Sequence, residues 1–294
     1  MLSKKVKIGF IGTGIIGLPM AKNLSENHYD ISAYSRNAKY HTNIKKNGIK
    51  VVRNLKDFFC KIDILILAVS DTKDVKGILT GRNGLVKNAI KPSIVIDMST
   101  ICPIETIKLS KLLKKNNISM IDAPVSGGEI GAINGSLSIM IGGEEKIVKK
   151  VMPILKILGD KITYIGSSGS GQVAKACNQI IVAQTLNAVS EAFVIADKFN
   201  VNKANIRSAL LGGFANSKVL DTHAKRILDN NFKPGFKTKL HAKDLRIVKN
   251  LANKKNLKLP GTNLANKNMK KCNQDGHSEK DSSSYYYIVK KQNK

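Results

Sequence analysis

Residues 7–27, KIGFIGTGIIGLPMAKNLSEN, place three patterns in succession. Lys7 to Ile11 is a short apolar run of the length expected for a buried strand, and the residues after Gly17 favour a helix. A G-x-G-x-x-G spacing lies between them, where glycines permit a tight turn and a close approach of the backbone to a pyrophosphate. The stretch therefore predicts a dinucleotide site at a helix N-terminus, formed by Gly12, Thr13, Gly14, Ile15, Ile16 and Gly17.

The second predicted strand, Ile31 to Tyr34, ends at the position that selects between NAD and NADP. A site that prefers NAD usually has a carboxylate about twenty residues after the loop, where it holds the ribose 2′-hydroxyl. Here Ser35 occupies that position and Arg36 follows it. A missing negative charge beside a guanidinium suits a 2′-phosphate, so the sequence favours NADP over NAD. The alternative is that Arg36 stacks on the adenine of either cofactor.

Strand and helix patterns continue to alternate along the first half of the chain. Buried strands are expected at 63–69, 93–96 and 119–121, and each is followed by polar or glycine-rich residues. This alternation is typical of a doubly wound parallel sheet, in which ligands bind beyond the carboxyl ends of the strands. We therefore expect these segments to form the rim of one cleft.

Ser126-Gly127-Gly128 is the rim segment whose residue types suit ligand binding best. Glycines after a strand expose backbone N–H groups, and the serine adds a hydroxyl, so the segment suits a carboxylate. A turn at Asn134-Gly135 then leads into a strand that returns to the sheet. After a helix at 144–158 and a short strand at 162–165, the sheet domain is expected to end near residue 165.

The next stretch begins with GSSGSGQVAKACNQ and continues without proline, as one long apolar helix, to Phe199. Apolar residues lie on nearly every side of it, so we expect a core helix buried between other elements and not a membrane span. Lys175 lies one turn into this helix, and Asn178 and Gln179 share its face. A lone helix lysine usually extends to water, but the glycine-rich rim upstream of Lys175 favours a chemical role.

The predicted fold class is α/β. A Rossmann-type doubly wound parallel sheet at 1–165 binds NAD(P), and an all-helical C-terminal domain at 166–294 serves substrate binding and oligomerisation, with the long helix joining the two. Further helices are expected at 205–211, 218–229, 241–255 and from 262, with a loop at 231–236. The three consecutive tyrosines near the end are expected to pack in a terminal helix.

The formal net charge of the chain is +28. Residues 1–165 hold 26 basic against 13 acidic side chains, and residues 166–294 hold 23 against 8. An excess spread this evenly, without an arginine-rich arm, argues against nucleic acid as the main partner. The four cysteines are widely spaced and form no C-x-x-C pair. We therefore expect reduced thiols, no metal site and a cytoplasmic protein.

Five segments resemble the β-hydroxyacid dehydrogenase family in order and spacing: GFIGTGIIGLPMAKNL, DMST, DAPVSGGEIGAINGSLSIMIGG, GSGQVAKACNQ and FKPGFKTKLHAKDL. The resemblance covers nearly the whole chain. It implies an NAD(P)-dependent enzyme, a homodimer or homotetramer, that acts on a small carboxylate-bearing aldehyde or β-hydroxyacid. The stretch GGFANSKVLDTHAKRILDNNFKPGF is most similar to members that reduce 2-hydroxy-3-oxopropanoate (tartronate semialdehyde) to glycerate. The alternative within the family is oxidation of 3-hydroxyisobutyrate or a related β-hydroxyacid.

The resemblance also implies a role for each matching residue. Lys175 matches the family's catalytic lysine, which stabilises and protonates the developing alkoxide. At Val69-Ser70 the family usually has Leu-Pro, so this chain departs from the pattern there. The remaining roles are substrate binding for Ser126, Gly127, Gly128, Asn178 and Gln179, and cofactor binding for Val69, Ser70, Thr100 and Lys243.

A rival interpretation from another class is a catalytically silent dehydrogenase fold that serves as a binding module, with nucleic acid as its partner because of the charge. Such a protein is expected to have lost the catalytic lysine. Lys175 is present, which favours the enzyme.

Overall fold

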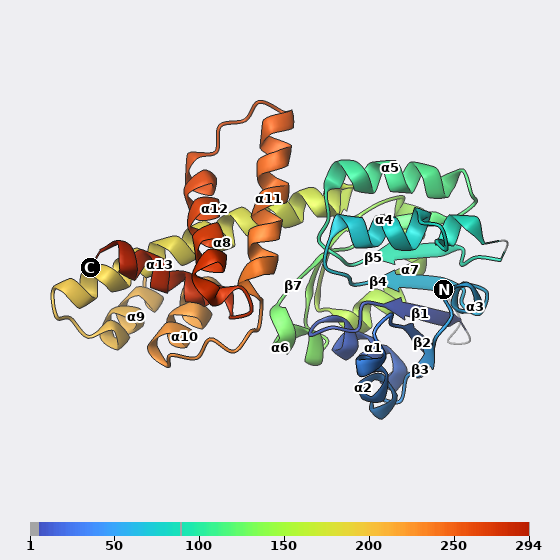
Figure 1. The fold of residues 1–294 in the computed structure, drawn as a ribbon, viewed down its shortest axis with the longest axis horizontal. Helices are drawn as coiled ribbons and strands as arrows, with labels where there is room; N and C mark the ends of the chain where they lie inside the picture. Colours follow the sequence, from blue (N-terminus) through green and yellow to red (C-terminus); the bar gives the residue numbers. More distant parts are fainter. Residues whose placement is uncertain (1–5, 89, 294) are drawn as a thin grey trace. The chain divides into compact units, whose positions relative to one another are not determined.

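The computed structural model of the protein describes residues 6–88 and 90–293. The chain divides into two compact units, Met1–Lys175 and Ala176–Lys294. The first unit is built around a sheet and the second consists of helices (Figure 1). This architecture confirms the predicted α/β class with a helical C-terminal part.

The sheet of the first unit has the strand order β3-β2-β1-β4-β5-β6-β8-β7, with β9 paired to β8. Neighbours from β3 to β6 pair in parallel, in the order typical of dinucleotide-binding sheets. The strands are β1 (Lys7–Ile11), β2 (Asp30–Tyr34), β3 (Lys50–Val52), β4 (Ile64–Leu67), β5 (Ile94–Asp97), β6 (Ser119–Asp122), β7 (Val125–Ser126), β8 (Ser138–Gly142) and β9 (Lys161–Gly166).

Helices cover both faces of this sheet, because alternate strand residues supply two separate apolar cores. In β4, Ile64 and Ile66 belong to one core, while Leu65 and Leu67 belong to the other. The first core takes residues from α1 (Gly17–Glu26), α2 (His41–Lys46), α6 (Gly128–Ile133) and α7 (Glu145–Leu158). The second takes residues from α3 (Leu55–Phe59), α4 (Thr72–Thr80) and α5 (Pro103–Lys114).

One edge of the sheet departs from the predicted parallel arrangement. β8 runs antiparallel to both β6 and β7, and the pairing becomes parallel again between β8 and β9. The chain reverses between β7 and β8 through α6 and the predicted Asn134-Gly135 turn. Gly135 has φ of 65°, a conformation that glycine adopts without strain.

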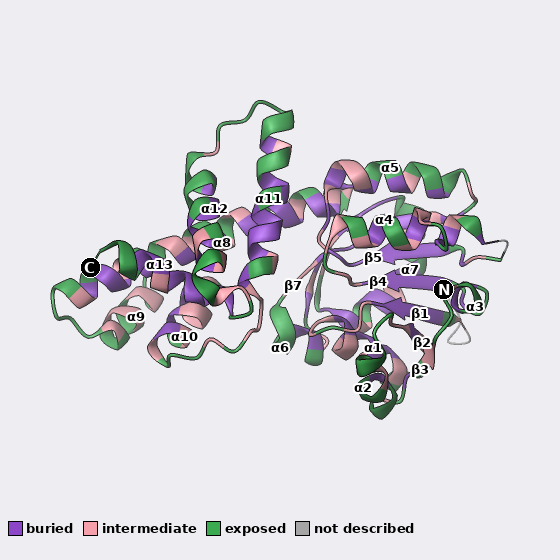
Figure 2. Ribbon diagram, viewed as in Figure 1, coloured by how far each residue is buried: buried purple, intermediate pink, exposed green. Residues whose placement is uncertain are grey.

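The second unit has its own apolar core, which includes Leu186, Phe193, Met269 and Tyr285 (Figure 2). The predicted terminal helix is present as α13, and two of its three tyrosines, Tyr285 and Tyr286, are buried. The helices are α8 (Ser170–Lys198), which begins in the first unit, α9 (Lys203–Leu211), a π-helical turn (Leu220–Ala224) that continues into α10 (Lys225–Leu228), α11 (Thr238–Lys254), α12 (Pro260–Cys272) and α13 (Tyr285–Gln292).

The expectation that α8 is buried on nearly every side is only partly correct. Ala183, Leu186 and Phe193 are fully buried, whereas Ile181 and Ile195 are exposed. Within the described residues, α8 is the one helix long and apolar enough to cross a membrane by length and composition alone. Core helices of other proteins meet the same criterion, and the inner face of α8 belongs to the helical core.

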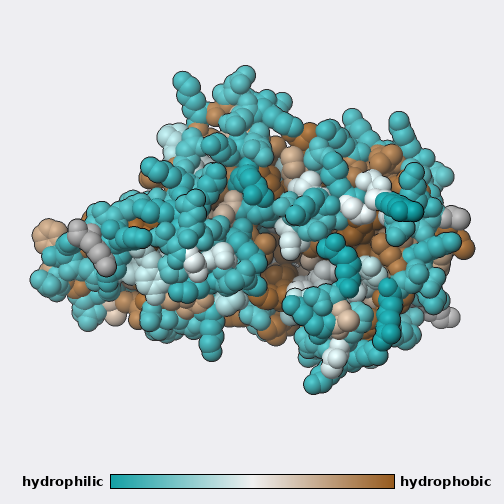
Figure 3. All heavy atoms as spheres, viewed as in Figure 1, coloured by the Kyte–Doolittle hydropathy of each residue, from teal (hydrophilic) through white to brown (hydrophobic). Residues whose placement is uncertain are grey.

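Hydrophilic side chains cover most of the molecular face drawn in Figure 3, over both units. Surface ion pairs such as Lys114–Glu144 and Lys225–Asp229 engage some of the basic side chains, but acidic side chains are too few to match the rest. The positive charge is therefore a property of the whole surface, as the even distribution along the sequence indicates.

A buried carboxylate fastens the C-terminal segment to the loop before α11. Asp281 accepts hydrogen bonds from the backbone N–H groups of Gly235 and Phe236, both at 3.0 Å, and from the N–H and hydroxyl of Ser283. Burial alone would raise the pKa of Asp281, but His223 and the N–H donors outweigh that effect and hold the pKa well below its usual range. The carboxylate therefore stabilises the fold in its ionised form.

Replacing this carboxylate should destabilise the helical unit. We expect Asp281→Ala to lower the free energy of unfolding by about 3 kcal/mol at pH 7, because several buried donors lose their acceptor. In the wild type this stabilisation is present above the unfolded pKa of about 3.9 and is lost as the pH falls through the lower folded value. Urea unfolding at pH 7 and pH 3 measures both effects.

Asp229→Ala is the matched control, because this carboxylate is exposed and its ion-pair partner among the described residues is Lys225, four residues before it. Its cost should stay within about 0.5 kcal/mol. Equal losses in the two variants would contradict the structural role of Asp281.

Candidate active site

In the loop between β1 and α1, two of the three glycines, Gly12 and Gly17, leave no room for a side chain. Gly12 has φ of 103°, and a Cβ on it would lie 2.2 Å from the carbonyl oxygen of Ala68. A Cβ on Gly17 would lie 1.8 Å from the carbonyl oxygen of Gly12, so helix and loop are in close contact there. A Cβ on Gly14 would meet no atom within 4 Å.

This loop fits the pyrophosphate of a dinucleotide. The open space beside Gly14 leaves room for a phosphate to approach the backbone. Helix α1 begins after Ile16 without a side-chain cap, so no side chain competes with an anion for the positive end of the helix dipole. Gly12 to Gly17 thus lie between β1 and the first turn of α1, and their role as the pyrophosphate site stays a prediction.

The residues after β2 offer a positive charge and no carboxylate. The Ser35 hydroxyl turns back to the carbonyl oxygen of Asn37, at 3.3 Å. Arg36 is 82% exposed, and its guanidinium lies 3.5 Å from Asp74 in a single weak contact. The guanidinium is therefore held loosely and is accessible to an anionic ligand.

The segments that follow β4 and β5 are tied to each other at the carboxyl edge of the sheet. The Val69 N–H donates to the Ser99 hydroxyl at 2.9 Å, and the Ser99 N–H donates to the buried Asp97 carboxylate at 3.0 Å. Ser70 follows Val69, and Thr100 follows Ser99. The predicted rim residues Val69, Ser70 and Thr100 therefore lie on two adjacent segments joined by a hydrogen bond.

Beyond β6 the chain exposes the backbone that the sequence predicts. Ser126 is half-buried and ends β7, opposite Ser138 of β8. Gly127 and Gly128 are exposed, with φ of 137° and 64°, values that favour glycine. Gly127 precedes the first residue of α6, and that helix has no side-chain cap. Its first N–H groups are therefore available beside the Ser126 hydroxyl.

Asp122 at the end of β6 caps the first turn of α8. This fully buried carboxylate accepts the N–H of Gly169 at 2.7 Å and the N–H of Gln172 at 3.0 Å. Burial raises the pKa of the Asp122 carboxyl, and these N–H groups oppose the rise. A single side chain thus joins the strand that leads to Ser126 with the helix that carries Lys175.

Gln172 makes a second connection from the same turn of α8. Its amide oxygen accepts the N–H of Ile101 at 3.0 Å, and its amide nitrogen donates to the carbonyl of Ser99 at 2.7 Å. These two backbone groups flank Thr100. The buried Gln172 side chain therefore fixes the Thr100 segment to α8 one turn before Lys175.

Lys175 is only 7% exposed, so the usual extension of a helix lysine to water does not occur. Asn178 and Gln179 follow on the next turn of α8, half-buried and buried respectively. A buried ammonium with amides on the same helical face is suited to polar chemistry away from bulk solvent.

The helical unit holds a chain of polar side chains that the sequence revealed only in part. The Asn178 amide donates to the Gln179 amide oxygen at 2.8 Å, and Gln179 donates to Asp244 at 2.6 Å. The other oxygen of Asp244 pairs with Lys243 at 2.6 Å. Asn178, Gln179 and Lys243 are thus connected through Asp244, a buried carboxylate that sequence analysis did not single out.

Three buried residues with a structural part in the site were therefore missed: Asp122, Gln172 and Asp244. Asp122 was seen only as a member of a polar rim segment, and Gln172 only as part of a helix start. Asp244 is adjacent to Lys243 in the sequence, and that adjacency was the one available signal for it.

No group of three His, Cys, Asp or Glu side chains is arranged to hold a metal ion within residues 6–88 and 90–293. The four cysteine thiols are free.

The fold and the glycine loop are those of a dinucleotide-binding protein, and comparisons with known proteins give the family. Residues 7–166 match the model of the NAD-binding domain of 6-phosphogluconate dehydrogenase. Residues 169–289 match the model described as the NAD-binding domain of NADP-dependent 3-hydroxyisobutyrate dehydrogenase. The chain belongs to the β-hydroxyacid dehydrogenase family.

Individual relatives agree with this membership. The chain is 39% identical, over 95% of both chains, to 2-hydroxy-3-oxopropionate reductase of Escherichia coli (strain K12). It is 30% identical to mitochondrial 3-hydroxyisobutyrate dehydrogenase of Rattus norvegicus, over 99% of this chain and 89% of that one. The solved 3-hydroxyisobutyrate dehydrogenase of Mycobacterium tuberculosis has a TM-score of 0.88 and 27% identity, covering 97% of this chain and 99% of that one.

The open space at Gly14 gives a test of the cofactor loop. We expect Gly14→Ala to fold normally, because the new methyl group meets no protein atom. Its dinucleotide affinity should fall at least about tenfold, because the methyl group occupies the approach to the pyrophosphate. Titration of NADPH by fluorescence measures the affinity.

Gly77→Ala in α4 is the control, because a methyl group there also meets no atom within 4 Å but lies in a helix without a predicted ligand. It should leave NADPH binding unchanged and add about 0.5–1 kcal/mol of stability. Unchanged NADPH affinity in Gly14→Ala would count against the loop as the pyrophosphate site.

The Gln172 connection gives a second test. Gln172→Ala leaves the Ile101 N–H and the Ser99 carbonyl without partners in a buried position, so we expect a loss of about 2–4 kcal/mol in the free energy of unfolding. Gln184→Ala on the same helix serves as the control, since Gln184 is exposed and makes one long hydrogen bond of 3.4 Å. Denaturant unfolding compares the two, and a loss in Gln172→Ala as small as that in the control would refute the connection.

Proposed function

We propose that this protein reduces 2-hydroxy-3-oxopropanoate to glycerate with a reduced nicotinamide cofactor. The proposal is carried by the 39% identity, over 95% of both chains, to the Escherichia coli 2-hydroxy-3-oxopropionate reductase. The reaction adds a hydride to the aldehyde carbon and a proton to its oxygen, which gives a primary alcohol. When bound, the reduced dinucleotide supplies the hydride, and the protein supplies the proton.

Lys175 is the proposed proton donor. Negative charge grows on the aldehyde oxygen as the reaction proceeds, and an ammonium stabilises that charge before transferring its proton. The burial of Lys175 supports this role, because an ammonium shielded from water acts more strongly on a nearby charge. Asn178 and Gln179, one turn further along α8, are proposed to orient the substrate or the lysine.

Ser126, Gly127 and Gly128 are proposed to hold the substrate carboxylate. The uncapped start of α6 and the adjacent hydroxyl support this assignment, because both offer hydrogen-bond donors to an anion. Glu129 follows directly, so the carboxylate would be held by backbone and hydroxyl groups and not by a cationic side chain.

Gly12 to Gly17, Val69, Ser70, Thr100 and Lys243 are proposed to bind the cofactor. We propose NADP(H) as the preferred form, because Arg36 is exposed and Ser35 replaces the carboxylate that would repel a 2′-phosphate. The ammonium of Lys243 forms an ion pair with Asp244 in the structure.

The second candidate is oxidation of 3-hydroxyisobutyrate. The second family model is described by that activity, and the rat 3-hydroxyisobutyrate dehydrogenase is 30% identical to the chain. Both substrates are short β-hydroxyacids or their aldehydes, so the same lysine and carboxylate site serve either reaction.

We further propose a homo-oligomer, a homodimer or homotetramer, in the cytoplasm. Exposed apolar residues recur along one side of α8 and just beyond it, at Ile181, Ile195 and Phe199. An exposed apolar stripe of this kind favours contact with a second copy. The free thiols favour a reducing compartment.

We also propose that the boundary between the two domains lies between residues 165 and 166, close to where the two family models meet.

The lysine gives the direct test of the mechanism. We expect Lys175→Met to reduce kcat at least about a hundredfold, because both the stabilising charge and the proton donor are lost. NADPH affinity should stay within about threefold of the wild type, since the substitution removes no proposed cofactor contact. Steady-state oxidation of NADPH and a binding titration measure the two quantities.

Lys198→Met, an exposed lysine at the end of α8, is the matched control and should retain full activity. Wild-type turnover by Lys175→Met would exclude Lys175 as the proton donor.

A further inference from the structure

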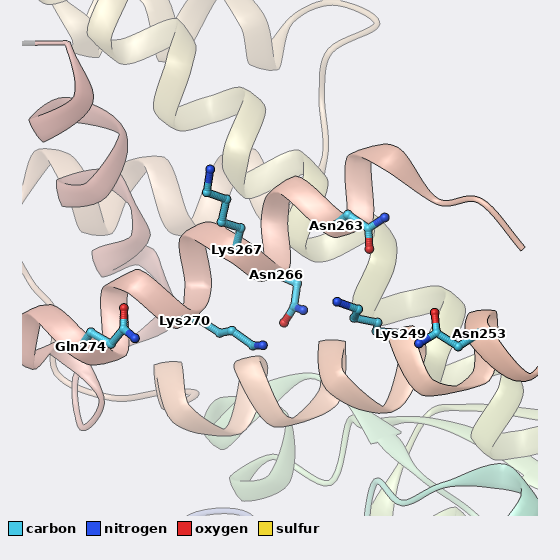
Figure 4. Close-up of a pocket in the computed structure, with 7 residues that line it drawn as sticks. All are labelled: Lys249, Asn253, Asn263, Asn266, Lys267, Lys270 and Gln274. Carbon is cyan, nitrogen blue, oxygen red and sulfur yellow. The ribbon is translucent and has the colours of Figure 1, made fainter.

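The helical unit contains a groove that the proposed reaction does not use. It lies between α11 and α12 and has a volume of about 470 Å³ (Figure 4). Every residue that lines it is a lysine, an asparagine or a glutamine, and none belongs to the candidate active site. A volume in this range suits a small organic molecule.

Asn266 on α12 is the informative residue of this groove. It is only 4% exposed, yet its side-chain oxygen has no hydrogen-bond partner in the described part of the chain. A buried carbonyl oxygen without a donor costs about 1–3 kcal/mol, and such groups are rare in folded proteins. Figure 4 shows this amide directed into the groove, so a bound molecule with a hydrogen-bond donor would satisfy it.

Two lysines flank that amide. In Figure 4 the side chains of Lys249, from α11, and Lys270, from α12, extend toward Asn266 from opposite sides. Neither ammonium has an acidic partner within the described residues, unlike Lys225 or Lys149, which pair with acids on their own helices. Unpaired lysines are common on so basic a surface, and the convergence of two of them on a buried amide distinguishes this groove.

We propose that the groove binds a small phosphate monoester that carries a hydroxyl group. The two ammoniums hold the phosphate dianion, because each supplies charge and up to three N–H donors. The hydroxyl donates to the Asn266 oxygen, which an anion alone cannot satisfy. Phosphate charge and hydroxyl donor together therefore define the ligand class, and this site is independent of the reaction at Lys175.

Two phosphate esters of similar size separate the charge from the hydroxyl contribution. Glycerol 3-phosphate carries hydroxyl groups, and propyl phosphate does not. We expect glycerol 3-phosphate to bind the wild type at least about fivefold more tightly than propyl phosphate in isothermal titration calorimetry. Titration in 0.15 M salt limits the long-range contribution of the net charge, because the Debye length is then about 8 Å.

Single substitutions then assign the binding to this groove. Lys249→Gln and Lys270→Gln should each weaken glycerol 3-phosphate binding at least about fivefold, whereas Lys254→Gln, an exposed lysine of α11 outside the groove, should change it less than twofold. All three remove one positive charge, so a general charge effect would weaken all three equally. Asn266→Leu should abolish the preference for glycerol 3-phosphate over propyl phosphate.

Three results would overturn the proposal: no binding by the wild type, equal weakening in the three lysine variants, or binding that Lys249→Gln and Lys270→Gln leave intact. The last result would place the phosphate elsewhere, for example at the Gly12–Gly17 loop. A wild type that does not distinguish the two esters would refute the role of Asn266.

Discussion

The capping of α8 by Asp122 is the constraint on which the rest of the candidate site depends. A helix of 29 residues begins inside the first unit beside the buried Asp122, and its first N–H groups have no partner within the helix. The buried carboxylate accepts the N–H of Gln172 and that of Gly169, just before the helix, and its charge suits the positive end of the helix dipole. Lys175 follows one turn later on the helix, and Ser126 follows four residues after Asp122. One side chain therefore sets the start of both segments, and Gln172 adds Thr100 to the same assembly.

The sequence predicts those parts of the structure that short-range patterns determine. The Gly12–Gly17 loop, the buried strands and the long helix follow from glycine spacing and apolar periodicity, which local backbone sterics and burial control. Asp122 and Gly169 are 47 residues apart, and Asp281 lies 46 residues after Gly235. A carboxylate that caps a distant segment has the same sequence appearance as one in a surface loop. These contacts form only when tertiary structure brings the segments together.

The antiparallel edge at β8 was missed for a similar reason, since a strand pattern in the sequence does not specify the direction of the strand that pairs with it.

The electrostatics of the protein separate a basic surface from a balanced interior. The chain carries +28 overall, yet three of its buried carboxylates are matched locally. Asp122 and Asp281 are met by backbone N–H groups, and Asp244 is met by Lys243 and Gln179. Burial without such partners would cost several kcal/mol for each ion. The excess lysines remain at the surface, where they attract anions at long range without fixing them. Specific recognition then needs short-range hydrogen-bonding groups, such as those proposed at Ser126–Gly128 and Asn266.

We propose that this member of the β-hydroxyacid dehydrogenase family reduces 2-hydroxy-3-oxopropanoate. The most direct test follows the absorbance of the reduced nicotinamide when purified wild-type protein is mixed with an aldehyde and a cofactor. Each of two aldehydes, 2-hydroxy-3-oxopropanoate and methylmalonate semialdehyde, is assayed with NADPH and, in parallel, with NADH. We expect rapid oxidation of the cofactor with 2-hydroxy-3-oxopropanoate, faster with NADPH than with NADH. Turnover of methylmalonate semialdehyde alone would contradict the substrate assignment in favour of 3-hydroxyisobutyrate chemistry, and no oxidation with either aldehyde would contradict the proposed enzymatic function.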